Sequence, residues 1–219
     1  MLEVRGLAKS WPGGAPLFEA VSLDLAPGEL VAILGESGAG KSTLLNIVAG
    51  LDRADAGTVT VSGTVVSALD DDERALWRRR AVGFVFQSFH LLPYLTVEEN
   101  VGLPLLLNGV AAAERRARSR AALEAVGMAA TASRKPASLS GGEMQRAAVA
   151  RAVVHRPALV LADEPTGNLD EANAAATMAA LREAVKRQGA AGLLVTHSAV
   201  AAASADRVLR LAGRHLGPA

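Results

Sequence analysis

The sequence predicts an α/β fold with a mainly parallel sheet, an antiparallel β part near the N-terminus and an inserted helical subdomain. A short, continuously apolar run at residues 30–34 precedes a segment of helical periodicity at 41–49. Two further apolar runs, at 158–162 and 193–196, flank a helical stretch at 171–186, as in a βαβ unit. Residues 88–156 carry helix signals and almost no strand pattern, so we expect them to form the inserted helical lobe.

The first lobe contains alternating strands and one fully buried strand. Residues 21–25 and 58–62 alternate between apolar and polar side chains, which is typical of half-buried strands. The run at 30–34 lacks polar positions and suits a strand buried on both faces of a parallel sheet. The helix expected at 41–49 is ended by Gly50.

Capping signals mark the starts of two helices. Asp70 with Glu73, and Thr96 with Glu99, have the spacing of a capping box. In this arrangement the side chain of the N-cap residue and the carboxylate three residues later each accept a hydrogen bond from a backbone N–H at the helix start. Pro104 should kink or end the second of these helices. We therefore expect a single domain of 1–219, in which a core at residues 1–87 and 157–219 carries an inserted helical subdomain at 88–156.

Composition excludes several classes of protein. The 219 residues suffice for one large domain or two closely joined lobes. Lys and Arg number 23 and Asp and Glu 22, so the net charge of +1 creates no strong field for nucleic acid, and no such partner is expected. Cysteine is absent, which excludes disulfides, thiolate catalysis and zinc sites built on sulfur. No apolar run approaches the ~18 residues of a spanning helix, and the N-terminus lacks secretory features, so a cytosolic location is expected.

A phosphate-binding loop lies between the apolar run and the first expected helix. Residues 35–42 match G-x-x-x-x-G-K-S, and their context of strand, loop and helix is the one this pattern requires. Backbone N–H groups and the helix start would form a nest for phosphate oxygens, with Lys41 reaching the β- and γ-phosphates and Ser42 ligating Mg²⁺. A plain glycine-rich turn would need neither Lys41 nor Ser42. The residues expected at the nucleotide here are Gly35, Glu36, Ser37, Gly38, Ala39, Gly40, Lys41 and Ser42.

Two adjacent carboxylates follow the apolar run at 158–162. Ligands of parallel sheets bind at the carboxyl ends of the strands, which is where Asp163 and Glu164 would lie. Asp163 would hold Mg²⁺, through water, and Glu164 would act as general base on the attacking water. Alternatively the two acids merely cap a loop, but the phosphate-binding loop argues against that reading.

The heptapeptide at residues 139–145, Leu-Ser-Gly-Gly-Glu-Met-Gln, makes the chain resemble the ATP-binding cassette (ABC) ATPases. Gln87 matches the family's Q-loop, the Asn-Leu-Asp at 168–170 its D-loop and His197 its switch histidine, all in family order. The resemblance covers essentially the whole chain and implies the fold of a P-loop NTPase of the ABC type.

Further segments are similar to one branch of this family. They look like the branch that contains lipoprotein-release, macrolide-export and cell-division ATPases, whose permeases have large periplasmic domains. The segments are Gly-Phe-Val-Phe-Gln at 83–87, Leu-Leu-Pro at 91–93, Thr-Val-Glu-Glu-Asn-Val at 96–101 and Ala-Asp-Glu-Pro-Thr-Gly-Asn-Leu-Asp at 162–170.

The resemblance implies a homodimer in the ATP-bound state. Ser140 and Gly142 would open a helix whose N–H groups point at an anion. In the family this signature covers the nucleotide of the other chain, so two MgATP would lie between head-to-tail protomers. Asp170, at the end of the D-loop, is also expected at the nucleotide.

The resemblance also implies roles for residues elsewhere in the chain that stand at matching positions of the family pattern. Trp11 stands where the family stacks an aromatic ring on adenine, the alternative being a core anchor. Thr43 should contact a phosphate, and Gln87 should sense Mg²⁺ and the attacking water. His197 should contact the γ-phosphate and help orient the water. Ser198 stands where the family often has aspartate, which leaves the local hydrogen bonding open.

The resemblance implies an ATPase that couples MgATP binding and hydrolysis to a separate integral membrane permease, held through it at the cytoplasmic face of the inner membrane. Export or extraction of a lipoprotein, lipid or drug-like substrate is expected. The alternative is a nucleotide-dependent structural module of the cell-division type. A soluble ABC protein acting on nucleic acid or ribosomes fits the near-zero charge and the single cassette poorly. Residues 78–80 and 114–120, rich in Arg, are expected to be solvated helix faces, with permease contact as the alternative.

Overall fold

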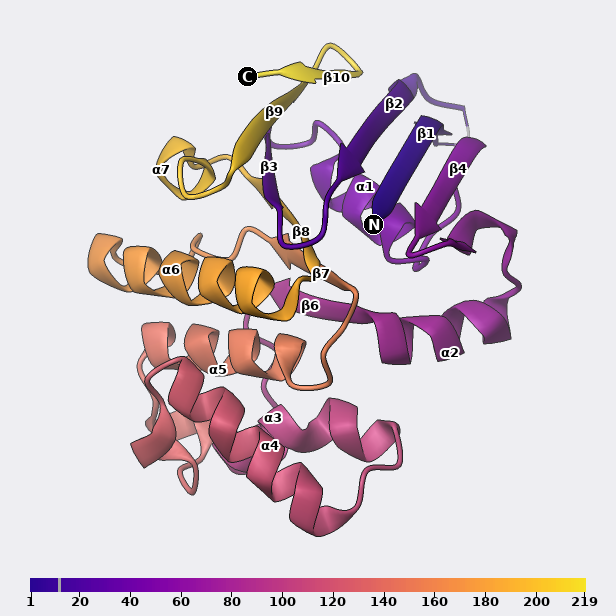
Figure 1. Ribbon diagram of the computed structural model, residues 1–219. Coiled ribbons are helices and arrows are strands. Elements are labelled where there is room, and N and C mark those ends of the chain that lie inside the picture. Colours follow the sequence, from indigo (N-terminus) through magenta and orange to yellow (C-terminus); the bar gives the residue numbers. More distant parts are fainter. Residues whose placement is uncertain (12) are drawn as a thin grey trace.

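The computed structural model describes residues 1–11 and 13–219 and contains two sheets (Figure 1). A six-stranded sheet has the order β10-β9-β3-β8-β7-β6, in which all neighbours are parallel except β9 and β10. An antiparallel four-stranded sheet has the order β2-β1-β4-β5. The strands are β1 (Leu2–Ser10), β2 (Pro16–Leu25), β3 (Leu30–Leu34), β4 (Ala56–Val61), β5 (Thr64–Val65), β6 (Val82–Phe86), β7 (Leu159–Asp163), β8 (Ala191–Thr196), β9 (Arg207–Ala212) and β10 (His215–Pro218).

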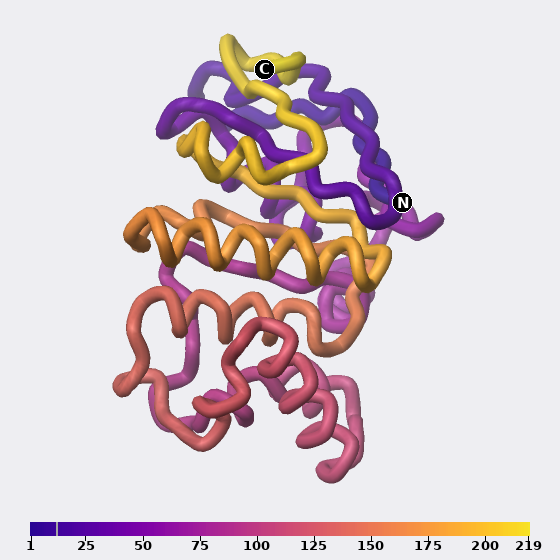
Figure 2. Tube along the Cα trace, turned by 60° about the vertical axis from the view of Figure 1, so that its left-hand side comes forward, coloured from indigo at the N-terminus to yellow at the C-terminus, as the bar shows by residue number. Residues whose placement is uncertain are grey.

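Helices lie on both faces of the six-stranded sheet. α1 packs between the two sheets, and α5 lies between α6 and the pair α3 and α4 in both ribbon and tube views (Figures 1 and 2). The helices are α1 (Lys41–Val48), α2 (Asp71–Ala81), α3 (Val97–Leu107), α4 (Ala112–Ala125), α5 (Gly141–Val153), α6 (Glu171–Gln188) and α7 (Ala199–Ala202).

The central strands supply side chains to two hydrophobic cores. In β3, Val31 and Ile33 enter the core shared with α1 and the antiparallel sheet, whereas Leu30 and Ala32 enter the core shared with α5 and α6. Strands buried on both faces need no polar positions, and this explains the continuous apolar runs of β3 and β7. The predicted parallel sheet and antiparallel β part are confirmed.

The capping signals are confirmed, and of the two outcomes expected at Pro104, a kink or a helix end, the helix end does not occur. Asp70 and Thr96 are N-caps with complete capping boxes through Glu73 and Glu99. Pro104 does not end α3, which continues to Leu107. The proline removes one backbone donor, but the surrounding core packing of the helix offsets that loss.

Residues 88–156, all of them described, form helices and turns without strands, as expected. The core between the sheet and α5 nevertheless contains side chains from both parts, such as Val101 of α3 and Val160 of β7. Division into a core at 1–87 and 157–219 and a helical subdomain at 88–156 stays a prediction.

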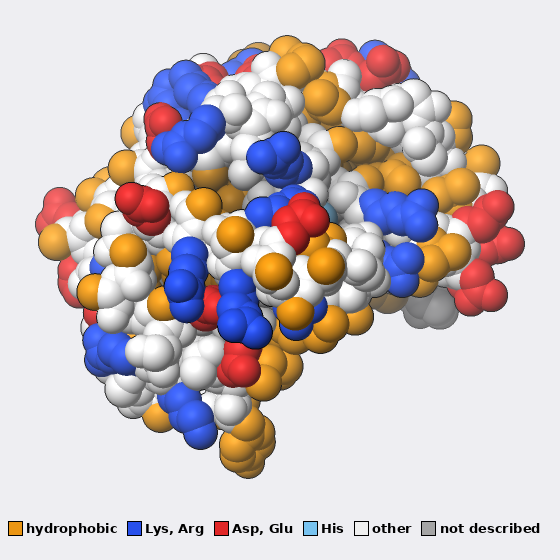
Figure 3. Space-filling view, turned by 60° about the horizontal axis from the view of Figure 1, so that its bottom comes forward, with side chains coloured by type: hydrophobic (Ala, Val, Ile, Leu, Met, Phe, Trp, Pro, Cys, Tyr) orange, Lys and Arg blue, Asp and Glu red, His pale blue; other side chains and the backbone are white. Residues whose placement is uncertain are grey.

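The basic segments are only partly solvated. Arg80 is exposed, but Arg78 and Arg79 are half-buried, and Arg78 donates to the Gly50 carbonyl. In α4 most of residues 114–120 are exposed while Ser119 is buried. The face in Figure 3 mixes both charge signs with hydrophobic side chains, in keeping with the net charge of +1.

Candidate active site

The loop between β3 and α1 has the backbone conformation of an anion nest. Gly38 and Gly40 have φ angles of 80° and 91°, in the left-handed region that favours glycine. A Cβ added at Gly40 would also lie 2.7 Å from Cγ of Leu17. α1 begins at Lys41, whose Nζ donates to the carbonyls of Gly35 and Glu36 at 2.8 and 2.9 Å. The ammonium and the start of α1 therefore lie at the same loop.

Two of the three residues expected at the metal, Ser42 and Asp163, are in contact, and the third, Gln87, lines the same cavity. Oγ of Ser42 donates to Oδ1 of Asp163 at 3.1 Å, joining the start of α1 to the end of β7. Burial raises the pKa of Asp163 above its ordinary value, and the hydrogen bond from Ser42 opposes this. Paired hydroxyl and carboxylate oxygens are donors of the kind Mg²⁺ prefers, so these residues fit the ion.

Glu164 is fixed by several contacts. Its Oε2 accepts hydrogen bonds from Oγ1 of Thr196 at 2.8 Å and from the backbone N–H of His197 at 3.2 Å. Its Oε1 lies 3.0 Å from Nδ1 of His197 and 3.9 Å from Nζ of Lys41. The Glu164 side chain is 14% exposed, whereas that of His197 is 66% exposed. The carboxylate thus lies at the floor of the site and the imidazole at its opening.

These side chains surround one cavity of about 690 Å³. Strand ends, the phosphate-binding loop and α1 bring them together from five separate parts of the chain. The lining is Trp11, Leu17, Ser37, Gly38, Gly40, Lys41, Ser42, Thr43, Gln87, Asp163, Glu164 and His197. Gly35, Glu36 and Ala39 belong to the same loop, but the described lining does not include them.

Three predicted nucleotide-site residues lie elsewhere: the described lining of this cavity does not include Ser140, Gly142 or Asp170. Ser140 caps α5 and Asp170 caps α6. The two helix starts are adjacent, because a Cβ added at Gly142 would lie 2.0 Å from Oδ1 of Asn173. One protomer therefore presents these residues apart from its own phosphate-binding loop.

The structure adds residues that the sequence reasoning missed. Leu17 lines the cavity beside the phosphate-binding loop, and Thr196 holds the expected general base. A polar residue ending an otherwise apolar strand was the signal for Thr196. Asn168 and Gln87 also pair, since each side-chain amide group donates to the other residue, at 3.3 and 3.4 Å. No comparable signal marks Leu17.

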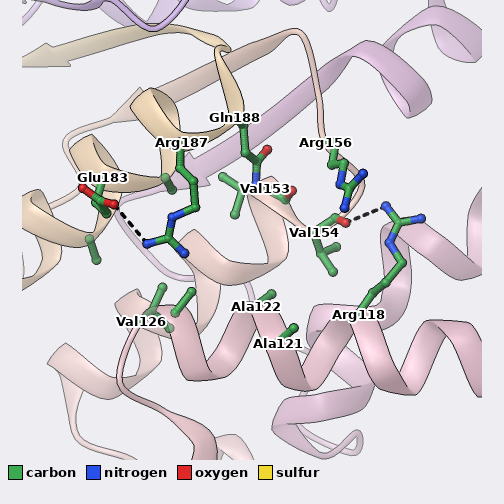
Figure 4. Close-up of a pocket in the computed structure, with 13 residues that line it drawn as sticks. Arg118, Ala121, Ala122, Val126, Val153, Val154, Arg156, Glu183, Arg187 and Gln188 are labelled. Atoms are coloured by element: carbon green, nitrogen blue, oxygen red, sulfur yellow. Dashed lines mark hydrogen bonds and ion pairs between the residues drawn. The ribbon is translucent and has the colours of Figure 1, made fainter.

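A second cavity of about 500 Å³ lies between α4, α5 and α6, away from the phosphate-binding loop (Figure 4). Two of the three arginines that line it are engaged in contacts within the protein. Arg118 donates to the Val154 carbonyl at 2.9 Å, and Arg187 pairs with Glu183 at 3.1 Å. We assign it no ligand.

Comparison with known proteins matches residues 18–167 to the family described as ABC transporter. The chain belongs to the ABC transporter family. It is 47% identical to the lipoprotein-releasing system ATP-binding protein LolD of Pseudomonas syringae pv. tomato, over 99% of this chain and 96% of that protein. It is 46% identical to LolD of Maricaulis maris, over 100% of this chain and 96% of that protein.

Two solved structures of the bacterial ABC transporter cassette MJ0796 share the fold. One is a dimeric structure, with a TM-score of 0.87 and 37% identity. The other is the dimeric post-hydrolysis state bound to ADP and Pi, with a TM-score of 0.87 and 36% identity. Each match covers 99% of this chain and 96% of that one.

This ABC protein is thus an ATP-binding and ATP-hydrolysing subunit of a transporter, and the predicted family, fold and activity are confirmed. Within the described residues, every helix is too short or too polar to cross a membrane.

Replacing Asp163 by asparagine should abolish most ATP turnover without destabilising the fold. Asparagine can still accept the hydrogen bond from Ser42, but it removes the negative charge that is expected to hold Mg²⁺. Since burial raises the pKa of Asp163, its charged form is disfavoured in the folded state, and a neutral side chain should hold or raise the unfolding temperature at pH 7. ATPase assays and thermal unfolding without nucleotide measure both effects. An inactive variant that unfolds at a clearly lower temperature would make Asp163 a structural residue instead.

Proposed function

We propose that this ABC ATPase is the energy-coupling subunit of a lipoprotein-releasing transporter, working with an integral membrane permease at the cytoplasmic face of the inner membrane. The observation that carries the proposal is identity of 44–47% to several LolD proteins over nearly the full length of both chains. Similarity over the whole length includes the surfaces that would meet a partner.

The proposed working unit is a head-to-tail dimer. Residues 140–142 begin α5, whose free N–H groups would attract a phosphate, yet the described lining of the chain's own cavity does not include them. A second protomer could bring its α5 over that cavity. The dimeric MJ0796 structures, which share the fold, support this arrangement.

In the proposed reaction, water attacks the γ-phosphorus, the bond from that atom to the β–γ bridging oxygen breaks, and Glu164 accepts the water's proton. The hydrogen bonds from Thr196 and the His197 backbone keep the Glu164 carboxylate in place. Lys41 would hold the β- and γ-phosphates, and His197 would contact the γ-phosphate at the opening. Ser42 and Asp163, with Gln87 beside them, would hold Mg²⁺, which when bound neutralises charge on the phosphates.

The proposed permease contact is an apolar groove of about 580 Å³ between α2, β6, α3 and α5. Leu51 and Leu107 line it and are 53% and 62% exposed. Large apolar side chains that are exposed together in a groove are typical of a surface that binds a partner. Arg151 connects the groove to the loop after Gln87, because it donates to the Phe89 carbonyl at 2.7 Å. An apolar cytoplasmic helix of the permease, seated here, would thereby sense the loop at the nucleotide.

Replacing Leu107 by glutamate should remove the permease from the purified complex while the isolated subunit still binds ATP. A buried, unpaired carboxylate would oppose docking of an apolar helix, whereas the nucleotide cavity lies elsewhere. Leu76→Glu is the matched control, because Leu76 is 50% exposed on α2 but outside the described groove lining. Affinity co-purification measures the effect. Retention of the permease by Leu107→Glu, or its equal loss in the control, would contradict docking at this groove.

Reconstitution tests the whole proposal. The subunit and the permease that co-purifies with it from native membranes should release an acylated protein from proteoliposomes when ATP is supplied. Release of the acylated protein to the same extent with and without ATP would contradict the proposal. ATP-dependent change in the permease without any release would instead favour a force-transmitting module of the cell-division type.

A further inference from the structure

Lys9 near the end of β1 places a charge against the ring expected to meet adenine. Its side chain is only 10% exposed, and its Nζ donates to Oδ1 of Asp52 at 3.1 Å and to the Arg53 carbonyl at 2.6 Å. The same nitrogen lies 5.3 Å from the centroid of the Trp11 ring. That distance is within the range of a cation–π interaction.

The segment that carries Trp11 is tied to the loop after α1. The Ser10 N–H donates to Oδ2 of Asp55 at 2.7 Å, and the Asp55 N–H donates to the Ala8 carbonyl at 2.9 Å. The same loop is held to α1, because the Asp52 N–H donates to the Asn46 carbonyl at 3.2 Å. Lys9 therefore sits on a fixed base that continues into the helix of the phosphate-binding loop.

The Trp11 ring lies between the nucleotide cavity and the Lys9 ammonium. Trp11 lines the nucleotide cavity and is 53% exposed, whereas the described lining of that cavity does not include Lys9. The ammonium contacts the ring from the protein side, so ring surface remains open toward the cavity. An indole at the end of a strand would otherwise reorient freely about its side-chain bonds.

We propose that Lys9 is a positioning residue for base recognition: its ammonium holds and polarises the Trp11 ring, so that the open ring surface is presented to the adenine of ATP. The proposal rests on the proposed function and on the stacking of Trp11 on adenine that the family resemblance implies. Lys9 itself would not touch the nucleotide, and its effect would pass through Trp11 alone. Its loss should therefore weaken binding of the base while leaving binding of the phosphates unchanged.

The test compares Lys9→Met with the unmodified protein by calorimetry, using ATP and inorganic tripolyphosphate as probes, both with Mg²⁺. Methionine keeps the length and apolar stem of lysine without its charge. ATP affinity should fall about three- to tenfold, the size of a partly buried cation–π contact, and tripolyphosphate affinity should not change. Lys9→Arg, which keeps the cation, should restore ATP affinity, and Lys135→Met at an exposed site is the control for loss of a charge.

A double-mutant comparison assigns the effect to the ring. Trp11→Ala should weaken ATP binding about tenfold or more, and adding Lys9→Met to it should change nothing further. The chain has two tryptophans, so in a Trp77→Phe background the fluorescence of Trp11 alone can be followed, and Lys9→Met should reduce its response to ATP.

Three outcomes would overturn the positioning role while leaving the ATPase intact: equal weakening of both probes by Lys9→Met, additive effects of the two substitutions, or normal ATP affinity in Trp11→Ala. Failure of the unmodified protein to bind either probe would instead overturn the nucleotide site itself.

Discussion

Replacing Glu164 by glutamine should leave ATP bound but slow its hydrolysis about 10²- to 10⁴-fold, the usual contribution of a general base. The amide retains an oxygen that can accept the hydrogen bonds from Thr196 and the His197 backbone, so the geometry at the floor of the cavity should persist. What the amide cannot do is take the proton of the attacking water. Single-turnover hydrolysis and nucleotide-binding measurements separate the two effects.

Glu171→Gln is a suitable control, because Glu171 is an exposed acid in the first turn of α6. It removes the same charge outside the described cavity lining and should hydrolyse ATP normally. Near-normal turnover in Glu164→Gln would show that another group activates the water, with His197 the next candidate.

The Ser140→Arg substitution should abolish both ATP-dependent dimerisation and turnover, while a single protomer still binds ATP. The arginine would fill the space in which the start of α5 should meet a nucleotide held by the other protomer. In the protomer itself Ser140 is exposed and lies outside the described lining of the phosphate-loop cavity, so nucleotide binding should survive.

Ser140→Ala separates this effect from loss of the helix cap. Ser140 caps α5 by accepting from the Glu143 N–H, and losing such a cap costs about 1 kcal/mol. The alanine variant should therefore be slightly less stable but should still dimerise and retain most of its turnover. An active, dimeric Ser140→Arg protein would refute a role for this helix start at the partner's nucleotide.

Local chemistry explains which parts of the fold could be predicted. The run at β3 and the capping boxes of α2 and α3 each depend on residues close in sequence, and the structure confirms them. It also places the loop at residues 35–40 between β3 and α1, as the sequence pattern predicts. Strand order is different, because β3 pairs with β8 and β9, which lie far along the chain. Periodicity within a segment holds no information about which distant strand lies beside it.

The candidate site shows the same division. Lys41, Ser42 and Asp163 were predictable because strand-end positions and loop spacing determine where they lie. Leu17 could not be predicted, since it reaches the cavity only through packing against Gly40. Likewise, Arg78 and Arg79 read as solvated charges in sequence, but packing of α2 at the groove half-buries them.

ATP-dependent dimerisation can be measured directly with the Glu164→Gln protein, because this variant should hydrolyse bound ATP only slowly. Light scattering without nucleotide should give the mass of one chain, 22.5 kDa, and with excess MgATP it should give twice that mass. ADP should not support the larger species, since it lacks the γ-phosphate that the partner's α5 would contact. A protein that binds MgATP and stays at 22.5 kDa would contradict the account.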